Sequence, residues 1–296
     1  MTPVRGVLAA GVTPLRDDGS RIDGEAIGAL YAFYAGSGLD GVLALGTTGE
    51  GILLDTAERK LVTRLAVEAS DVPVLVHVGA QTTAESVSVA AYAAEVGAAG
   101  VAAIGPPYFA FDDAELLAHF LAIAAACAPL PFYVYEFAAR AGYAVPLSVI
   151  ASLRDRASNL VGLKVSDQPW DRFSPYLLDG LDIFVGPEPL IAEGMRAGAV
   201  GVVSGLAGGL PEAVLDVAAH EWDVDASARA GALRSLVNEY PFQAALKSIL
   251  SWRGLPIRDQ VRRPLRGLEN REAAELRRRL AAFDDRYVFE AEAGVD

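Results

Sequence analysis

Eight short, almost continuously hydrophobic runs alternate with segments of helical periodicity, and this alternation most limits the folds open to the chain. The runs lie at residues 7–14, 41–46, 73–79, 100–106, 132–137, 160–166, 182–188 and 201–205. Uninterrupted hydrophobic strands are typical of parallel sheets that are covered on both faces. Eight such strands alternating with helices predict an α/β protein built on a closed (β/α)8 TIM barrel.

The segments between the runs carry the start and stop signals of helices. Residues 23–38 and 55–70 both begin with Asp, and residues 82–97 end at Gly97, which suits a helix C-terminus. A doubly wound open sheet is the alternative fold. Such a sheet normally has a glycine-rich dinucleotide-binding turn after its first strand, and VTPLRDDG at 12–19 is not one.

The strand pattern stops at Glu221, and the rest of the chain is helical in character. Three amphipathic patterns follow, over residues 225–240, 242–254 and 270–287. A connector rich in Pro and Arg lies at 255–268, and there is no low-complexity linker. We therefore expect a barrel domain at 1–222 and a C-terminal helical extension at 223–296 that packs on the barrel.

The charge and the cysteine and histidine content of the chain indicate which partners and metal sites to expect. The formal net charge of −13 argues against nucleic acid and anionic membranes as main partners. The single Cys127 lies in an apolar helical stretch, which predicts a buried, unreactive thiol. The three histidines (His77, His119 and His220) lack the spacing of metal ligands, so we expect no metal site.

One apolar segment needs separate treatment because it approaches the length of a membrane span. Residues 116–135 hold no Asp, Glu, Lys or Arg. Pro129 and Pro131 interrupt the run, and the part after them is β-branched and aromatic, so we expect a helix, a turn and a buried strand. The N-terminus lacks the pattern of a signal peptide. These features predict no membrane partner and a cytoplasmic location.

Polar side chains concentrate at the carboxyl ends of the predicted strands, the edge where (β/α)8 barrels carry their chemistry. They are Thr47, Thr48 and Glu50 after the second strand, Tyr135 and Glu136 at the end of the fifth with Arg140 just beyond it, Lys164 and Ser166 on the sixth, Glu188 at the end of the seventh, and Ser204 at the end of the eighth. We take these residues as candidates for a functional site.

Lys164 is the most informative candidate, because the chain has only three lysines and this one interrupts an apolar, β-branched strand. Its side chain must point into the barrel or toward the helices, and neither side is well hydrated. Burial disfavours the charged form of an amine, and a neutral amine is a nucleophile toward ketones. A lysine that reaches the rim and pairs with Glu188 or Asp167 explains the residues equally well at this point.

Two neighbouring features favour a site around Lys164. Tyr135 lies on the adjacent strand, and a buried phenol needs a hydrogen-bond partner, although aromatic residues in strands usually fill the core. The GTTGEG segment at 46–51 can form a tight loop whose N–H groups bind a carboxylate or phosphate. An ordinary glycine-rich turn remains an equal alternative, because the segment is neither a P-loop nor a dinucleotide motif.

Three motifs together resemble the dihydrodipicolinate synthase / N-acetylneuraminate lyase family of pyruvate-dependent class I aldolases. They are GTTGE at 46–50, YEFAARAG at 135–142, which fits a Y-x-x-x-x-R-x-G pattern, and GLKVS at 162–166. Further segments at 11–23, 196–212 and 261–276 also look like the family, so the resemblance spans nearly the whole chain. The joint occurrence of the motifs, in this order, is specific.

The resemblance implies a Schiff-base mechanism without metal or cofactor. Lys164 would attack the keto carbon of pyruvate and form an iminium, and loss of a methyl proton would give an enamine that adds to an aldehyde. Tyr135 would transfer protons, with Thr47 hydrogen-bonded to it. Thr47 and Thr48 would bind the pyruvate carboxylate, and the carbonyl of Val203 would line the pocket.

Among the residues implied to face the second substrate, Arg140 fits the family pattern and several others depart from it. Arg140 matches the position that binds a carboxylate of the second substrate in dihydrodipicolinate synthases. The departures are Glu136 and Ala138 in place of Asn and Pro, Phe109 in place of a tyrosine that completes a proton relay between subunits, Glu188 in place of a shorter acid, and Gly208 in place of Asn. Glu136, Glu188 and Ser204 remain candidate substrate contacts.

We therefore expect a Schiff-base aldolase or lyase whose small-molecule substrates are pyruvate or another 2-oxo acid and an aldehyde, including sugar-acid derivatives. Three alternatives stay open: a 4-hydroxy-tetrahydrodipicolinate synthase that uses aspartate semialdehyde, a Schiff-base sugar-acid dehydratase, and a non-catalytic barrel that binds 2-oxo acids. The resemblance also implies a homo-oligomer, either a dimer or a tetramer.

Overall fold

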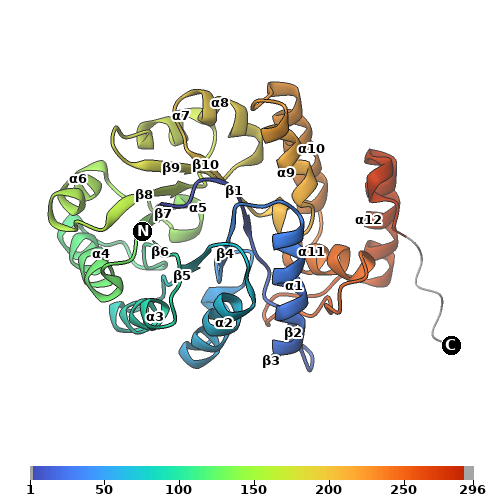
Figure 1. Ribbon diagram of the computed structural model, residues 1–296, viewed down its shortest axis with the longest axis horizontal. Helices are drawn as coiled ribbons and strands as arrows, with labels where there is room; N and C mark the ends of the chain where they lie inside the picture. The colour runs from blue at the N-terminus through green and yellow to red at the C-terminus, as the bar shows by residue number, and fades with distance from the viewer. Residues whose placement is uncertain (1–2, 290–296) are drawn as a thin grey trace.

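The computed structural model describes residues 3–289, and its centre is a closed barrel of eight parallel strands (Figure 1). The barrel strands are β1 (Gly6–Ala10), β4 (Gly41–Ala44), β5 (Val74–His77), β6 (Gly100–Ile104), β7 (Phe132–Glu136), β8 (Leu160–Val165), β9 (Asp182–Val185) and β10 (Gly201–Ser204). They follow chain order around the barrel, and β1 closes it by pairing with β10. The predicted (β/α)8 barrel is confirmed, and the open sheet is excluded.

Helices surround the barrel, one set after each strand (Figure 1). The α-helices of this layer are α1 (Gly24–Gly36), α2 (Thr56–Ala69), α3 (Thr83–Glu95), α4 (Asp113–Cys127), α5 (Ala138–Ala141), α6 (Leu147–Arg156), α7 (Trp170–Phe173), α8 (Ile191–Arg196) and α9 (Pro211–Ala219). Short 3-10 turns are η1 (Gly51–Leu53), η2 (Ser174–Tyr176), η3 (Glu188–Leu190), η4 (Leu206–Gly208) and η5 (Asp285–Tyr287).

Local sequence signals explain where these helices begin and end. Asp55 caps α2 in a capping box with Glu58, and Gly97 follows α3 with a φ of +82°, a left-handed conformation that suits glycine. A small antiparallel pair, β2 (Leu15–Arg16) with β3 (Arg21–Ile22), is absent from the sequence prediction. Its strands have two residues each, too few to produce a periodic pattern.

The uncharged segment 116–135 forms most of α4, a turn and most of β7, as predicted. Within residues 3–289, no helix combines the length and apolarity that crossing a membrane requires. Cys127 is buried at the end of α4, and burial raises the pKa of its thiol to about 11. The thiol therefore stays protonated near neutral pH, as expected for an unreactive cysteine.

Apolar side chains fill the barrel interior in layers and leave its carboxyl end for polar residues. The lower layers consist of Val4, Leu8, Ala10, Leu43, Leu75, Ala102, Tyr133, Phe184 and Val203. A smaller group above them contains Ile104, Tyr135 and Ala141. Because side chains alternate along a strand, Tyr133 and Tyr135 of β7 both point inward and Val134 points toward the helices.

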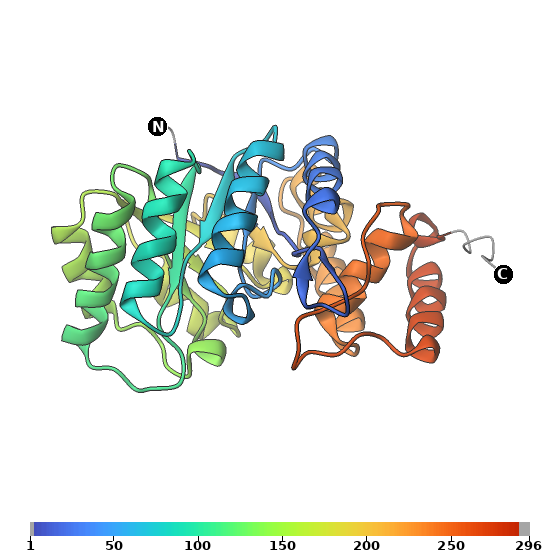
Figure 2. The same ribbon diagram turned by 90° about the horizontal axis from the view of Figure 1, so that it is seen from below.

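The C-terminal extension consists of α10 (Val224–Asn238), α11 (Phe242–Trp252) and α12 (Asn270–Phe283). Figure 2 shows these orange and red helices standing at one end of the molecule beside the barrel. The third predicted helix, at 270–287, is interrupted at Asp284, where the backbone is extended before η5. Residues 1–2 and 290–296 of the two expected domains lie outside the described range.

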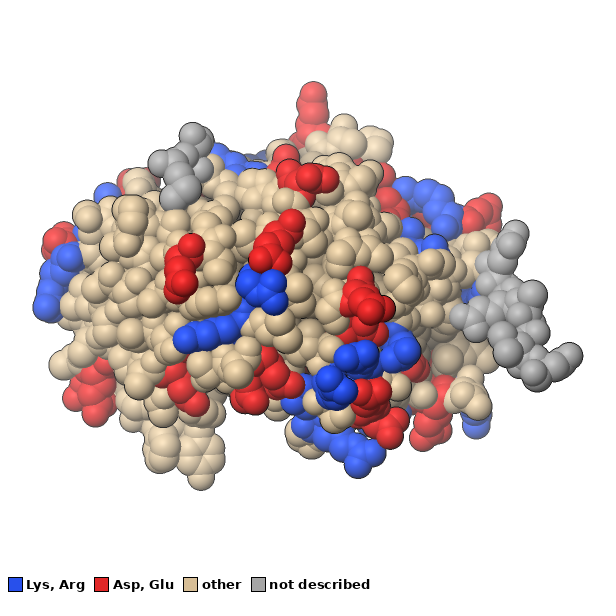
Figure 3. All heavy atoms as spheres, turned by 60° about the horizontal axis from the view of Figure 1, so that its bottom comes forward, with Lys and Arg blue, Asp and Glu red and all other residues tan. Residues whose placement is uncertain are grey.

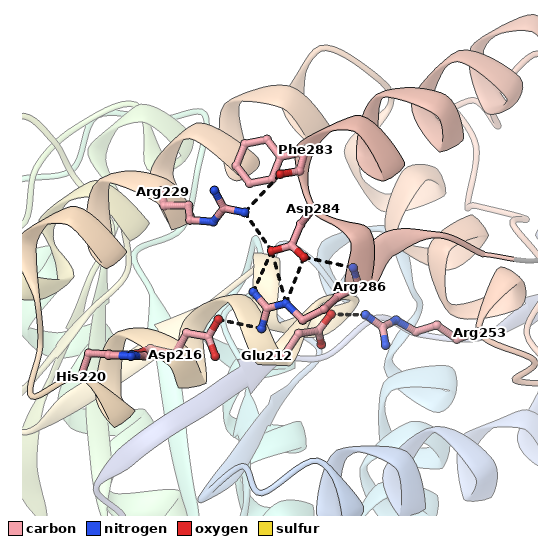
Figure 4. A network of polar contacts seen from close by, with 8 residues as sticks. All are labelled: Glu212, Asp216, His220, Arg229, Arg253, Phe283, Asp284 and Arg286. Carbon is pink, nitrogen blue, oxygen red and sulfur yellow. Dashed lines mark hydrogen bonds and ion pairs between the residues drawn. The ribbon is translucent and has the colours of Figure 1, made fainter.

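A network of paired charges fastens the end of α12 to the neighbouring helices (Figure 4). The Asp284 carboxylate accepts hydrogen bonds from Arg229 at 2.8 Å and from Arg286 at 2.9 Å. Arg286 also pairs with Asp216 of α9 at 2.8 Å. Hydrogen bonds from Arg286 hold the pKa of the Asp284 carboxyl below its ordinary value. Each of these charged side chains is paired with one of opposite charge, and the pairs hold α12 in place.

The surface shown in Figure 3 mixes both signs of charge. On that face several lysine and arginine side chains lie close together toward the lower right, with Asp and Glu side chains beside them. Arg64 and Glu68 form an exposed i,i+4 pair on α2, and Arg278 and Glu275 form an exposed i,i+3 pair on α12. Such pairs contribute little to stability.

A fully buried ion pair joins the extension to the barrel. Lys247 Nζ on α11 lies 2.5 Å from Glu50 Oε1, and both side chains are 0% exposed. Lys247 also donates to the carbonyl of Gln260 at 2.7 Å, and the second Glu50 oxygen accepts from the Arg262 N–H at 2.6 Å. The pair therefore ties the loop at 46–51 to α11 and to the connector before α12.

Breaking this pair on one side should destabilise the protein strongly. Lys247→Met leaves the Glu50 carboxylate buried without its counter-charge, so we expect a loss of about 3–5 kcal/mol in the free energy of unfolding. The double variant Glu50→Gln/Lys247→Met should lose less, because neither charge remains buried. Urea unfolding measures both values.

Arg64→Gln is the matched control, because Arg64 forms an exposed pair with Glu68, and it should cost less than about 1 kcal/mol. A Lys247→Met variant as stable as this control would contradict the structural role of the buried pair.

Candidate active site

The carboxyl ends of the barrel strands surround a cavity of about 650 Å³. Strand ends and the loops after them contribute Thr47, Thr48, Tyr135, Arg140, Lys164, Ser166, Asp167, Glu188 and Val203 to its wall. The extension contributes Arg234, Ser235, Asn238, Tyr240, Phe242 and Gln243. The C-terminal helices thus form one wall of the site, a role that the sequence analysis did not assign to them.

Lys164 and Tyr135 face each other inside the barrel. They occupy paired register positions on β8 and β7, and their exposed fractions are 7% and 2%. Lys164 Nζ lies over the Tyr135 ring, 4.0 Å from its centroid. Within residues 3–289, no carboxylate lies within ion-pair distance of Lys164, so it does not form the predicted alternative pair with Glu188 or Asp167.

The Tyr135 phenol is buried beside groups that lower its pKa. Burial alone would raise its pKa, but the Lys164 charge and hydrogen bonds with Thr47, Ser166 and Lys164 outweigh it and lower the pKa below its ordinary value. The Thr47 hydroxyl lies 3.4 Å from the phenol oxygen. Tyr135 is therefore suited to exchange a proton with a group bound beside Lys164.

His77 of β5 packs against Tyr135 of β7 although β6 lies between the two strands, a contact that the sequence did not predict. The two rings meet edge to face with centroids 5.7 Å apart. The Ile104 N–H donates to His77 Nε2 at 3.3 Å, which leaves the proton on Nδ1 to donate to the Leu45 carbonyl at 3.2 Å. Burial, with the charges of Arg59 and Lys164, lowers the pKa of His77 to about 3, so the ring is neutral.

The loop that carries Thr47 and Thr48 is held from two sides. Thr13 donates to the carbonyl of Gly49 at 2.6 Å, and Gln243 of α11 donates to the carbonyl of Thr47 at 3.1 Å. A Cβ on Gly51 would lie 1.9 Å from the Leu45 carbonyl oxygen, so only glycine fits there. Gln243 is a further residue that the sequence analysis missed, because nothing near it signals a polar contact to a loop so distant in the chain.

Glu188, Ser204 and Val203 lie together, in different roles. Val203 lines the cavity, whereas Ser204 is fully buried and donates to Glu188 Oε1 at 2.6 Å. The Leu206 N–H donates to the same oxygen at 3.1 Å, and Arg234 lies 3.4 Å from it. Ser204 thus positions the Glu188 carboxylate and does not itself reach the cavity.

Arg140 lies at the cavity wall, whereas Glu136 does not. Arg140 lies on α5 at the cavity wall, with its guanidinium 5.8 Å from the Phe137 ring centroid and no ion-pair partner within residues 3–289. Glu136 is fully buried, is not part of the cavity wall, and accepts from the Val145 N–H at 2.9 Å. Phe109, on the loop after β6, is 63% exposed and also does not line the cavity of its own chain.

The chain matches the family model described as the dihydrodipicolinate synthetase family over residues 3–283. It is 33% identical over 289 residues to an uncharacterized DapA-like lyase of Halobacterium salinarum, which covers 94% of this chain and 93% of the relative. The chain belongs to the dihydrodipicolinate synthase / N-acetylneuraminate lyase family. Membership places it among DapA-like lyases, and the resemblance inferred from the three motifs is confirmed.

Solved structures of family members show the same architecture. N-acetylneuraminate lyase from Proteus mirabilis is 25% identical with a TM-score of 0.86, and the match covers 98% of this chain and 100% of that one. A chloride-inhibited dihydrodipicolinate synthase from Acinetobacter baumannii, complexed with pyruvate, is 25% identical with a TM-score of 0.85 and coverage of 95% and 99%. Within the family these two enzymes carry different names, so membership leaves the substrate undetermined.

The acidity of Tyr135 is directly testable. Among the ten tyrosines, we expect one phenol to ionise below the ordinary pKa in an ultraviolet pH titration, and Tyr135→Phe should remove that transition. Lys164→Met should move it to higher pH, because burial then acts without the opposing charge.

Tyr133→Phe is the control, since Tyr133 is buried on the same strand and its hydroxyl has no hydrogen-bond partner among the described residues. If a transition below the ordinary tyrosine pKa is still present in Tyr135→Phe, another tyrosine is responsible for it.

Proposed function

We propose that the protein is a pyruvate-dependent class I aldolase or lyase that forms a Schiff base on Lys164. The observation that carries the proposal is the position of the buried Lys164 amine, which lines the cavity and lies 4.0 Å from the Tyr135 ring centroid. Within residues 3–289, no carboxylate forms an ion pair with this amine. An amine without a salt-bridge partner, beside an acidic phenol, is suited to carbonyl addition. The pyruvate-bound Acinetobacter baumannii relative supports the choice of ligand.

The chemistry follows from these two side chains. Lys164 first gives a proton to the Tyr135 phenolate, and its neutral amine then adds to the keto carbon of pyruvate. Tyr135 returns that proton when the carbinolamine oxygen leaves as water. The resulting iminium draws electrons from the neighbouring methyl carbon, and the Tyr135 phenolate takes a proton from that carbon to give an enamine. The enamine carbon adds to an aldehyde, and in the reverse direction a 4-hydroxy-2-oxo acid is cleaved.

Thr47 and Thr48 would bind the pyruvate carboxylate at the same end of the cavity. Thr47 lies against the phenol, and Thr48 lines the wall with an exposed fraction of 6%. Gln243 and the Glu50–Lys247 pair hold their loop, so the extension would help to position the carboxylate. The Val203 carbonyl completes this half of the proposed site.

Arg140 would bind an anionic group on the second substrate. Its guanidinium is exposed at the cavity wall without a carboxylate partner in the described part of the chain, and guanidinium binds carboxylates in a bidentate manner. This favours an aldehyde or sugar acid with a negative charge, and it keeps 4-hydroxy-tetrahydrodipicolinate synthase as the second candidate. Phe109 weighs against that candidate, because it lacks the hydroxyl of the tyrosine expected there.

A homo-oligomer is part of the proposal. Tyr108 and Phe109 are 85% and 63% exposed on the loop after β6, and two adjacent aromatic rings in water favour contact with a second copy of the chain.

Borohydride reduction in the presence of pyruvate tests the Schiff base. The chain has only Lys60, Lys164 and Lys247, so mass spectrometry of peptides should assign one covalent adduct to Lys164. Lys60→Arg should leave the adduct unchanged, and Lys164→Arg should abolish it. An unmodified wild-type protein, or an adduct on Lys60, would refute the proposed function.

Arg140→Gln tests the second half of the site. With aspartate semialdehyde or another carboxylate-bearing aldehyde, kcat/KM should fall about 10-fold or more, because a charge-assisted hydrogen bond is lost. With an uncharged aldehyde such as glyceraldehyde, kcat/KM should stay within about 3-fold. An equal loss with both kinds of aldehyde would contradict a carboxylate-binding role.

A further inference from the structure

Two acidic side chains lie together beside the candidate site, on the ends of the two strands that carry Tyr135 and Lys164. Glu136 directly follows Tyr135 on β7, and Asp167 lies three residues after Lys164, just beyond β8. Their exposed fractions are 0% and 6%. Neither carboxyl group has a lysine or arginine within ion-pair distance among residues 3–289.

The hydrogen bonds of the pair leave room for one proton. Glu136 Oε2 accepts from the Val145 N–H at 2.9 Å, and Asp167 Oδ2 accepts from the Ala138 N–H at 2.9 Å. Glu136 Oε1 is buried and has no donor among the described residues. Two ionised carboxylates cannot hydrogen-bond to each other, whereas a protonated and an ionised carboxyl can.

The surroundings favour the same assignment. Burial and the contact with Asp167 raise the pKa of Glu136 to about 8. The other titratable groups that act on this carboxyl are the phenols of Tyr143, in the segment before α6, and Tyr176, in η2. Both phenols are neutral near pH 7, because burial raises their pKa. Lys164, Arg140 and Arg172 line the same cavity as Asp167, and within residues 3–289 none of them forms an ion pair with either carboxyl group.

The two carboxyl groups differ in what they reach. Asp167 lines the cavity that also contains Lys164 and Tyr135, whereas Glu136 lies behind it and does not. A proton held between them is therefore accessible to a bound molecule through Asp167 alone.

We propose that Glu136 and Asp167 share one proton, and that Asp167 exchanges it with the oxygen of the aldehyde substrate during carbon–carbon bond formation and cleavage. This inference rests on the proposed Schiff-base function and adds a second proton-transfer group to it. Asp167 is the catalytic residue of the pair, and Glu136 is a positioning residue that keeps the proton available.

The step balances without a co-reactant. In condensation, the enamine carbon bonds to the aldehyde carbon, the carbonyl electron pair moves onto oxygen, and that oxygen takes the proton from Asp167. The enamine nitrogen becomes the iminium, and Asp167 becomes a carboxylate. In cleavage, the carboxylate removes the hydroxyl proton, and the electrons of the breaking carbon–carbon bond return to the iminium. Tyr135 then serves the pyruvate half alone.

The shared proton can be tested without any substrate. Infrared difference spectra of the free enzyme should show a protonated carboxyl band that disappears as pH rises through about 8. Glu136→Gln should remove the band, and Asp167→Asn should move its titration to lower pH, because a neighbouring negative charge is lost. Asp171→Asn is the control, because it removes one negative charge at an exposed position of the nearby helix α7. It should change neither the carboxyl band nor the pH at which the band titrates. A wild type without the band, or a band that persists in Glu136→Gln, overturns the proposal.

The catalytic role is tested by separating the two halves of the reaction. Pyruvate trapping by borohydride should be equal in the wild type, Asp167→Asn, Glu136→Gln and Asp171→Asn. Aldol turnover, with glyceraldehyde and aspartate semialdehyde as probes, should fall about 100-fold or more in Asp167→Asn and stay unchanged in Asp171→Asn. Turnover by Asp167→Asn at the wild-type rate, or no aldol product from the wild type with either probe, overturns the catalytic role.

Glu136→Gln should reveal itself in the pH profile. Condensation needs the protonated pair, so the wild-type rate should fall above about pH 8, and cleavage should fall below it. This change in rate near pH 8 should be absent from the pH profile of Glu136→Gln. A purely structural role of Glu136 would not remove it. Failure of trapping in the wild type would refute the Schiff base itself, while the infrared result would still decide whether the proton is shared.

Discussion

The Lys164 amine lies over the Tyr135 ring, and this contact determines what chemistry the candidate site can carry out. The barrel brings the two side chains to paired positions on adjacent strands and surrounds them with buried neighbours. The cation lowers the pKa of the phenol, and the phenol lies where it can exchange protons with anything bound to the amine. Apolar layers below and a polar cavity above limit access to the carboxyl end of the barrel.

The surrounding structure holds this contact in place through connections between distant parts of the chain. His77 packs its neutral ring against Tyr135, and Thr47 contacts the phenol from a loop that Gln243 and Lys247 of the extension secure. The helical extension is thereby part of the site as well as an addition to the barrel. The charge network around Asp284 in turn holds α12 against α9 and α10.

The sequence predicted the fold well because hydrophobic periodicity is a local signal. All eight barrel strands and the long helices could be recognised, as could the polar residues at strand ends. The direction of a side chain at a strand end was harder to predict, since one residue decides between the cavity and the helical layer. Glu136 and Ser204 were expected near the substrate and lie behind the wall, whereas Asp167 and Gln243 reach it. Their contacts join distant segments, which no local pattern reveals.

A crystal structure of the protein soaked with pyruvate would show whether Lys164 forms the Schiff base. We expect continuous electron density from Lys164 Nζ to the second carbon of pyruvate. The Tyr135 oxygen should lie within hydrogen-bond distance of the reacting atoms, and the carboxylate should lie at Thr47 and Thr48. A free Lys164 side chain with pyruvate bound elsewhere, or an adduct from which Tyr135 is turned away, would contradict the account.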